Sequence, residues 1–237
     1  MILAAGRGQR MRPLTDHTPK PLLSVGGTPL IEWHLRRLAQ SGFEEVVVNN
    51  AWLGQQIQDC LGDGSRWGLS LRHSPEPDAL ETAGGIANAL RWLGDDPFLV
   101  VNGDIWTDWD FRLAQQACKK LADDSKLLAW LVMVPNPAQH PQGDFVLTQD
   151  GTVHEPGLAS HPLDLATYTF SGIGIYKPAL FESIAPGTAA PLAPLLRQAM
   201  RHNQVAGSLH LGQWYDIGTP ERLAELDTRL SRLSNGS

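Results

Sequence analysis

The chain has 237 residues, of which 42% are hydrophobic and 19% charged, and its formal net charge is −6. This composition supports a sizeable folded core and excludes a disordered chain. The acidic balance argues against nucleic acid or an anionic membrane as the main partner. The longest apolar run, residues 127–134, is far too short to span a bilayer.

The first 134 residues alternate between strand-like and helical patterns. We expect strands at 1–5, 46–49, 69–73, 98–101 and 127–134, and helices at 29–40, 52–61, 83–93 and 113–121. Strands that are apolar throughout and alternate with amphipathic helices indicate a parallel sheet covered on both faces. The expected fold class is therefore α/β, with a Rossmann-like, mostly parallel sheet flanked by helices.

The pattern changes after Pro135. The segments 144–148, 152–154 and 168–176 are β-rich, are broken by Pro and Gly, and have no helix between them. A strand at 205–211 then lies between helices at 193–202 and 221–233. This order predicts a smaller, more antiparallel β-rich lobe inserted in the second half, and the C-terminus shows no hexapeptide repeat that would indicate a β-helix.

Cys60 and Cys118 are the two cysteines of the chain. Neither lies in a Cys-x-x-Cys motif or at metal-ligand spacing, so we interpret both as reduced, packed thiols. No charged leader precedes the apolar residues at the N-terminus, so we expect no signal peptide. Together these features predict a cytoplasmic protein.

A glycine-rich turn, Gly6-Arg7-Gly8, follows the first strand directly. Glycines let backbone N–H groups approach an anion closely, although a plain tight turn is the alternative. The turn is not a P-loop, because no Gly-Lys-Ser/Thr follows. It is also not a dinucleotide fingerprint, because Met11 stands where the third glycine belongs.

Four cations follow in or after this turn: Arg7, Arg10, Arg12 and Lys20. Lys20 lies between two prolines, which restrain the backbone on either side of it. Arginine suits the forked geometry of phosphate and lysine acts as a point charge. We therefore favour a polyphosphate site over the alternative, a solvated basic loop.

The segment from Leu3 to Leu22, LAAGRGQRMRPLTDHTPKPL, resembles the signature of the sugar-1-phosphate nucleotidyltransferases, with Gln9 where the family usually has Thr or Ser. The resemblance extends over nearly the whole chain. The segments 51–57, 61–68 and 195–200 are similar to a bacterial branch of uridylyltransferases that act on N-acetylmuramic acid 1-phosphate.

This resemblance implies transfer of UMP from UTP to N-acetylmuramic acid α-1-phosphate, with UDP-N-acetylmuramic acid and pyrophosphate as products, in peptidoglycan recycling. A mannose-1-phosphate guanylyltransferase, or another hexose-1-phosphate nucleotidyltransferase, is the alternative. The partners would be small-molecule substrates rather than nucleic acid or membrane, and the protein a monomer or weak homodimer. The chain would form one domain, with a nucleotide-binding part at about 1–134, a sugar-binding part at about 135–219 and a C-terminal helix at about 220–233.

Two aspartates are candidate Mg²⁺ ligands. Asp104 follows the strand at 98–101, and Asp216 lies just beyond a late strand. A carboxylate at a strand end is a natural oxygen ligand for Mg²⁺, although either residue could also complete a turn. The resemblance makes Asp104 and Asp216 the paired metal ligands and Mg²⁺ the cofactor.

The resemblance also assigns the remaining site residues. The catalytic residues would be Arg10, Lys20 and Asp104. The nucleotide would contact Ala5, Gly6, Gly8, Gln9, Arg10, Lys20, Glu76, Thr82, Ala83, Gly84 and Asn102, with a helix-capping role for Glu76 and its neighbours as the alternative. The sugar would contact Gly103, Gly143, Asp144, Glu155, Ser171 and Gly172. Pro156 follows Glu155 where many relatives have a lysine that serves the sugar phosphate.

The pair Asp108 and Asp110 mimics the Asp-x-Asp motif of metal-dependent glycosyltransferases. Because it precedes a predicted helix, we interpret it as capping that helix. A glycosyltransferase that uses this pair is one rival class of function. A non-catalytic sugar-nucleotide sensor on the same fold is the other.

Overall fold

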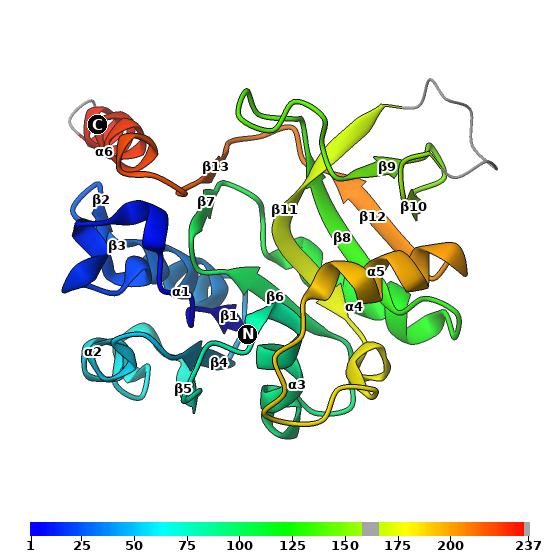
Figure 1. The fold of residues 1–237 in the computed structure, drawn as a ribbon, viewed down its shortest axis with the longest axis horizontal. Helices are drawn as coiled ribbons and strands as arrows, with labels where there is room; N and C mark the ends of the chain where they lie inside the picture. Colours follow the sequence, from blue (N-terminus) through cyan, green and yellow to red (C-terminus); the bar gives the residue numbers. More distant parts are fainter. Residues whose placement is uncertain (158–165, 235–237) are drawn as a thin grey trace.

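Figure 1 shows the computed structural model of the protein, which describes residues 1–157 and 166–234. The helices are α1 Leu30–Gln40, α2 Gly54–Leu61, α3 Glu81–Leu93, α4 Arg112–Asp123, α5 Leu192–Arg201 and α6 Pro220–Ser234. The strands are β1 Ile2–Leu3, β2 Ser24–Val25, β3 Thr28–Pro29, β4 Glu45–Asn50, β5 Ser70–Pro75, β6 Phe98–Asn102, β7 Ile105–Thr107, β8 Ala129–Val134, β9 Phe145–Leu147, β10 Val153–His154, β11 Thr167–Tyr176, β12 Val205–Leu209 and β13 Trp214–Asp216.

The central sheet runs β12-β8-β11-β6-β1-β4-β5. The pairs β1–β4, β1–β6, β4–β5 and β8–β12 are parallel, and β11 runs antiparallel to both β6 and β8. The first residues of β11 also pair with β9, which forms a small extension with β10. The predicted Rossmann-like, mostly parallel α/β fold is confirmed, and β11 and β12 from the second half of the chain complete the same sheet.

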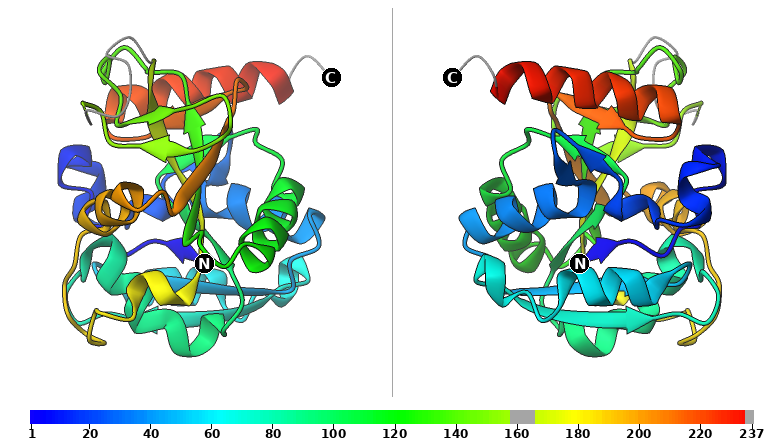
Figure 2. Two further views of the ribbon diagram at one scale, coloured as in Figure 1. Left: turned by 90° about the vertical axis from the view of Figure 1, so that its right-hand side faces the viewer. Right: turned by 90° about the vertical axis from the view of Figure 1, so that its left-hand side faces the viewer.

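Helices cover both faces of this sheet (Figure 2). One face packs side chains of β1, β4 and β6 against α1, α2 and α4 in a cluster that includes Ile2, Ile31 and Leu121. The opposite face packs alternate residues of the strands against α3 and α5, in a cluster that includes Val100, Ile86 and Leu196. Burial on both faces explains why the strands are apolar throughout.

The structure also contains elements that the hydrophobic pattern did not predict. The segment between β1 and α1 forms three short 3-10 helices and the β2–β3 hairpin. The short strands β7 and β13 pair antiparallel outside the main sheet. Helix α6 packs on β2 and β13, so it connects the end of the chain with the segment that follows β1 (Figure 1).

Within the described part of the chain, no helix combines the length and the apolar character needed to cross a membrane.

Candidate active site

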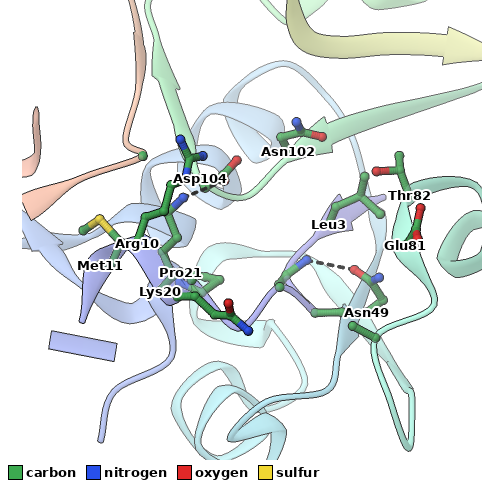
Figure 3. Close-up of a pocket in the computed structure, with 17 residues that line it drawn as sticks. Leu3, Arg10, Met11, Lys20, Pro21, Asn49, Glu81, Thr82, Asn102 and Asp104 are labelled. Carbon is green, nitrogen blue, oxygen red and sulfur yellow. Dashed lines mark hydrogen bonds and ion pairs between the residues drawn. The ribbon is translucent and has the colours of Figure 1, made fainter. Parts of the chain in front are cut away.

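A cavity of about 470 Å³ opens where β1, β4 and β6 end, and we call it the main cavity (Figure 3). This is the edge of a parallel sheet at which α/β folds bind ligands. Its lining residues come from the glycine-rich loop, the strand ends and the start of α3: Leu3, Ala4, Ala5, Gly6, Gly8, Gln9, Arg10, Met11, Lys20, Pro21, Asn49, Ala79, Glu81, Thr82, Asn102, Asp104 and Gly218.

A second cavity of about 310 Å³, the adjoining cavity, shares Arg10, Asn102 and Asp104 with the main cavity. The rest of its wall comes from β7, β11, β13 and the connection between β8 and β9. These further lining residues are Ile105, Pro137, Gln139, His140, Thr169, Phe170, Ser171, Gly172, Trp214 and Asp216. Two ligands could therefore meet at Arg10 and Asp104.

The glycine-rich loop is closed by local hydrogen bonds. Gly8 has φ 65°, which an L side chain rarely adopts. Its carbonyl accepts from Met11 N at 2.9 Å and from Thr15 Oγ1 at 2.8 Å. A Cβ at Gly8 would lie 3.2 Å from Lys20 Cβ, so glycine lets the loop and the Lys20 stem pack closely.

The four cations of this segment have different environments. Arg7 stacks over the Trp52 ring at 4.2 Å, and Arg12 pairs with Asp16 at 2.6 Å. Lys20 is buried, and its Nζ lies 2.7 Å from Asp104 Oδ2. Within residues 1–157 and 166–234, the Arg10 side chain has no hydrogen bond or ion pair, and it lines both cavities. Arg10 is thus available to a ligand anion.

Asp104 and Asp216 lie beside each other although they are far apart in the sequence. Asp216 of β13 pairs with Ile105 of β7, and Ile217 N donates to Asp104 O at 2.9 Å. Both aspartates line the adjoining cavity. Asp216 receives hydrogen bonds from Arg222 of α6, both on its carboxylate and on its carbonyl oxygen. Each carboxylate is therefore balanced by a cation.

Three of the predicted nucleotide contacts, Glu76, Ala83 and Gly84, are buried and are not among the residues that line the main cavity. Glu76 is buried and accepts hydrogen bonds from Asn49 Nδ2 at 2.7 Å and from Leu80 N at 2.9 Å. Burial raises the pKa of this carboxyl group. Glu76 therefore braces the turn before α3 against β4, and it is not among the residues that line the main cavity.

Ala83 and Gly84, also predicted to contact the nucleotide, lie in the first turn of α3. Their N–H groups donate to Ala190 O at 2.9 and 3.1 Å, so the first turn of α3 is satisfied by the segment before α5. A Cβ at Gly84 would lie 2.3 Å from Thr188 O. Only glycine at position 84 lets the start of α3 pack this closely on the segment before α5. The other predicted nucleotide contacts line the main cavity: Ala5, Gly6, Gly8, Gln9, Arg10, Lys20, Thr82 and Asn102.

Of the predicted sugar contacts, Ser171 and Gly172 line the adjoining cavity. Gly103 is buried under β1, where its N–H donates to Leu3 O at 2.8 Å. Glu155 lies 3.4 Å from Arg197 Nε and 3.6 Å from Arg201 Nη2, so its carboxylate faces α5.

Gly143 and Asp144 are not among the residues that line either cavity. Gly143 forms a turn at φ 63°, and Asp144 binds His140 and the backbone of β11.

Several lining residues were not predicted. Glu81 begins α3 with φ 58°, a conformation uncommon for a residue other than glycine, and it faces the main cavity (Figure 3). Gly218 lies two residues after Asp216 and could have been found by extending the search beyond the aspartate. His140 and Trp214 line the adjoining cavity through tertiary contacts, and no local sequence signal marks them.

The carboxylates of Asp108 and Asp110 are engaged by other groups of the protein. Asp110 Oδ1 accepts from Arg112 N at 3.0 Å at the start of α4, as predicted for a helix cap. Asp108 Oδ1 instead lies 2.8 Å from His210 Nε2 and accepts from Gln213 N, so its expected capping role is wrong. The described residues contain no group of three or more His, Cys, Asp or Glu arranged to hold a metal ion.

Comparison with known protein families agrees with this fold and with this arrangement of loop, cations and carboxylates. A model of the nucleotidyl transferase family matches residues 1–232, and the chain belongs to this family.

The relatives of the chain are sugar-1-phosphate nucleotidyltransferases. The N-acetylmuramate alpha-1-phosphate uridylyltransferase of Neisseria meningitidis serogroup B is 55% identical over 95% of each chain. The enzyme of the same name from Caulobacter vibrioides is 32% identical over 98% of this chain and 96% of that one. A crystal structure from Bacillus anthracis, described as a glucose-1-phosphate thymidylyltransferase, superposes with a TM-score of 0.81 at 21% identity, over 97% of this chain and 94% of that one. The last similarity concerns the fold.

Proposed function

We propose that this chain is an Mg²⁺-dependent uridylyltransferase that transfers UMP from UTP to N-acetylmuramic acid α-1-phosphate and releases pyrophosphate. The observation that carries this proposal is the meeting of Arg10, Lys20, Asp104 and Asp216 where the two cavities join. The 55% identity to a relative of that name supports the choice of nucleotide and sugar.

The reaction requires positioning more than proton transfer. The attacking oxygen belongs to a sugar phosphate that is already an anion, so no strong general base is needed. The difficulty is to bring two polyanions together and to stabilise negative charge on the leaving pyrophosphate. UTP would occupy the main cavity, and the sugar phosphate would occupy the adjoining cavity.

The residues of the loop divide this task. The backbone from Gly6 to Gly8 and the guanidinium of Arg10 would hold the β- and γ-phosphates of UTP. Lys20, held in place by its neighbouring prolines and by Asp104, would neutralise the α-phosphate. Because Arg10 also lines the adjoining cavity, it could compensate for the missing lysine after Glu155 by facing the acceptor phosphate.

The donor set fits Mg²⁺. Asp104 and Asp216 offer carboxylate oxygens at the wall of one cavity, and phosphates and water would supply the remaining ligands. When bound, Mg²⁺ would neutralise charge on the reacting phosphates. Lys20 and Arg222 keep both carboxylates oriented and charge-balanced. We further propose a cytoplasmic enzyme that acts on small molecules as a monomer or weak homodimer.

A pyrophosphate-release assay over four nucleoside triphosphates and a panel of sugar 1-phosphates, with Mg²⁺ and with EDTA, tests the proposal. We expect UTP with N-acetylmuramic acid 1-phosphate to give the highest rate and EDTA to abolish it. The variants Lys20→Ala and Asp104→Asn should each lower the rate by about a hundredfold or more, since electrostatic groups of this kind typically contribute that much.

Arg12→Ala is the matched control, because Arg12 belongs to the same segment but pairs with Asp16. Near-normal pyrophosphate release by Lys20→Ala or Asp104→Asn would contradict the proposal. Sugar transfer without pyrophosphate would indicate a glycosyltransferase, and nucleotide binding without turnover would indicate a sensor. A preference for GTP with mannose 1-phosphate would replace the proposed substrates while retaining the class of reaction.

A further inference from the structure

The connection between β8 and β9 carries two polar side chains, Gln139 and His140, that line the adjoining cavity. This connection lies beyond the ends of the central strands, next to β11 (Figure 1). None of the roles assigned above to the phosphates or the metal uses either residue. They therefore offer contacts to the part of an acceptor that lies away from the reacting phosphates.

The connection is held rigidly on β11. Asn136 donates from Nδ2 to Pro141 O at 3.2 Å and to Thr167 O at 3.1 Å, and its Oδ1 accepts from Thr169 Oγ1 at 3.0 Å. Gly143 N donates to His140 O at 3.2 Å, which closes the turn. Because these bonds fix the backbone on both sides of His140, the imidazole is preorganised at the cavity wall.

Asp144 fixes the imidazole itself. Its Oδ1 lies 3.0 Å from His140 Nε2, and its Oδ2 accepts from Phe170 N at 2.8 Å. The carboxylate is thus bound to the backbone of β11 and holds the ring from one side. An imidazolium donates from both ring nitrogens, so with Nε2–H on Asp144 its Nδ1–H can donate to a second anion. Asp144 acts here as a positioning residue, through His140.

The charge of the proposed acceptor matches this arrangement. N-acetylmuramic acid differs from N-acetylglucosamine by a lactyl ether that bears a carboxylate. Among the residues that line the adjoining cavity, Arg10 and His140 are those that can carry positive charge, whereas Asp104 and Asp216 would repel an anion. Arg10 is engaged by phosphates in the proposed function, which leaves His140 for the carboxylate.

We propose that His140, oriented by Asp144 and assisted by the amide of Gln139, binds the lactyl carboxylate and selects the acidic sugar over N-acetylglucosamine 1-phosphate. This assignment rests on the proposed function. A carboxylate bound by a positioned cation is a charge-assisted hydrogen bond, which is about twice as strong as a neutral one.

The test compares two acceptors that differ only in the lactyl group. We would measure kcat/KM for UMP transfer from UTP to N-acetylmuramic acid 1-phosphate and to N-acetylglucosamine 1-phosphate. His140→Ala should lower kcat/KM for the acidic sugar by about ten- to a hundredfold and leave the value for the neutral sugar within about twofold, as expected for loss of a hydrogen bond between charged groups. His140→Lys should restore most of the preference.

Two further variants distinguish a direct contact of His140 with the sugar from a general effect on the structure of this turn. Asp144→Asn keeps an acceptor for Phe170 N but removes the charge beside the imidazole, and it should lower the acid preference by a smaller factor than His140→Ala. Gln142→Ala is the matched control, because Gln142 is exposed on the same turn and does not line the cavity. It should leave both kcat/KM values unchanged.

An equal loss with both sugars after His140→Ala would show a structural role and overturn the inference. An unchanged preference would do the same, because the carboxylate would then be bound elsewhere. If the unaltered protein used both sugars equally, the inference would fail while uridylyl transfer stood. If it transferred UMP to neither sugar, the proposed function would fail with it.

Discussion

Arg222 of α6 holds the carboxylate of Asp216, and replacing it with glutamine should impair the proposed Mg²⁺ site more than the fold. Arg222 Nη1 donates to Asp216 Oδ2, and to Asp216 O at 3.1 Å. A Cβ at Gly218 would lie 3.2 Å from both terminal guanidinium nitrogens, so glycine makes room for this contact. Glutamine is shorter and neutral, and it cannot reproduce both bonds.

The magnitude follows from the partial burial of the pair. The two side chains are 23% and 30% exposed. A hydrogen bond between charged groups contributes about 1.5–3 kcal/mol, and partial solvent screening reduces this to about 1–2 kcal/mol. The free energy of unfolding in urea should fall by that amount, which leaves a protein of ordinary stability folded.

The effect on activity should be larger. Arg222 engages Oδ2, so Oδ1 remains free for the proposed Mg²⁺, and the guanidinium would orient this ligand. Loss of such an orienting partner typically costs about 10–100-fold in metal affinity or activity. We therefore expect Arg222→Gln to raise the Mg²⁺ concentration for half-maximal pyrophosphate release about tenfold or more.

Arg229→Gln provides the control. Arg229 lies on the same helix and donates to the hydroxyl of Tyr215, the neighbour of Asp216, at 2.6 Å. Its replacement should not change the Mg²⁺ dependence. If Arg222→Gln bound Mg²⁺ more tightly than the unaltered protein, the guanidinium would compete with the metal instead of orienting its ligand, and the reasoning would be refuted.

Three further predictions concern stability. Burial lowers the pKa of His34 to about 4 from 6.5 in the unfolded chain, so the unfolded state binds the extra proton. The free energy of unfolding should therefore fall by up to about 1.4 kcal/mol per pH unit as the pH drops from about 6.5 to about 4. In urea unfolding, His34→Gln should reduce this dependence on pH. If the variant and the unaltered protein showed the same dependence, His34 would not be its source. Gly84→Ala introduces a Cβ that would meet Thr188 O, and it should lower the free energy of unfolding by about 1–3 kcal/mol. A change in the KM for UTP without a loss of stability would instead favour contact between Gly84 and the nucleotide. Met11 is fully buried against Leu226 and Leu230, and Met11→Ala should cost about 2–4 kcal/mol and raise the KM for UTP. Leu230→Ala should lower stability alone, and a matching rise in KM would show that the loop effect is not specific to Met11.

Local sequence patterns were sufficient for most of the architecture. The apolar strands and amphipathic helices were predicted to within a few residues, because their periodicity reflects which faces they bury. The β2–β3 hairpin and the β7–β13 pair were missed, because strands of two or three residues are too short to show a period.

Some residues of the candidate site could also be predicted from local sequence, and others could not. The glycine-rich loop and its cations could be singled out as a candidate polyphosphate site because its glycines, Arg10 and Lys20 lie within one contiguous segment, and the structure places them on the wall of the main cavity. Glu76 could not be placed, because a carboxylate before a helix looks the same in the sequence whether it faces a cavity or is buried on Asn49 and Leu80.

The sequence by itself thus determined the class of fold and the position of the glycine-rich loop proposed to bind phosphate, since both depend on the order of neighbouring residues and on the conformations that glycine and proline allow. Only the tertiary structure decided which charges meet: Lys20 with Asp104, Arg222 with Asp216, and His140 with Asp144 beside β11. These contacts depend on strand register and on the packing of α6 against the beginning of the chain. Register and packing are set by burial summed over the whole molecule, and no local pattern encodes them.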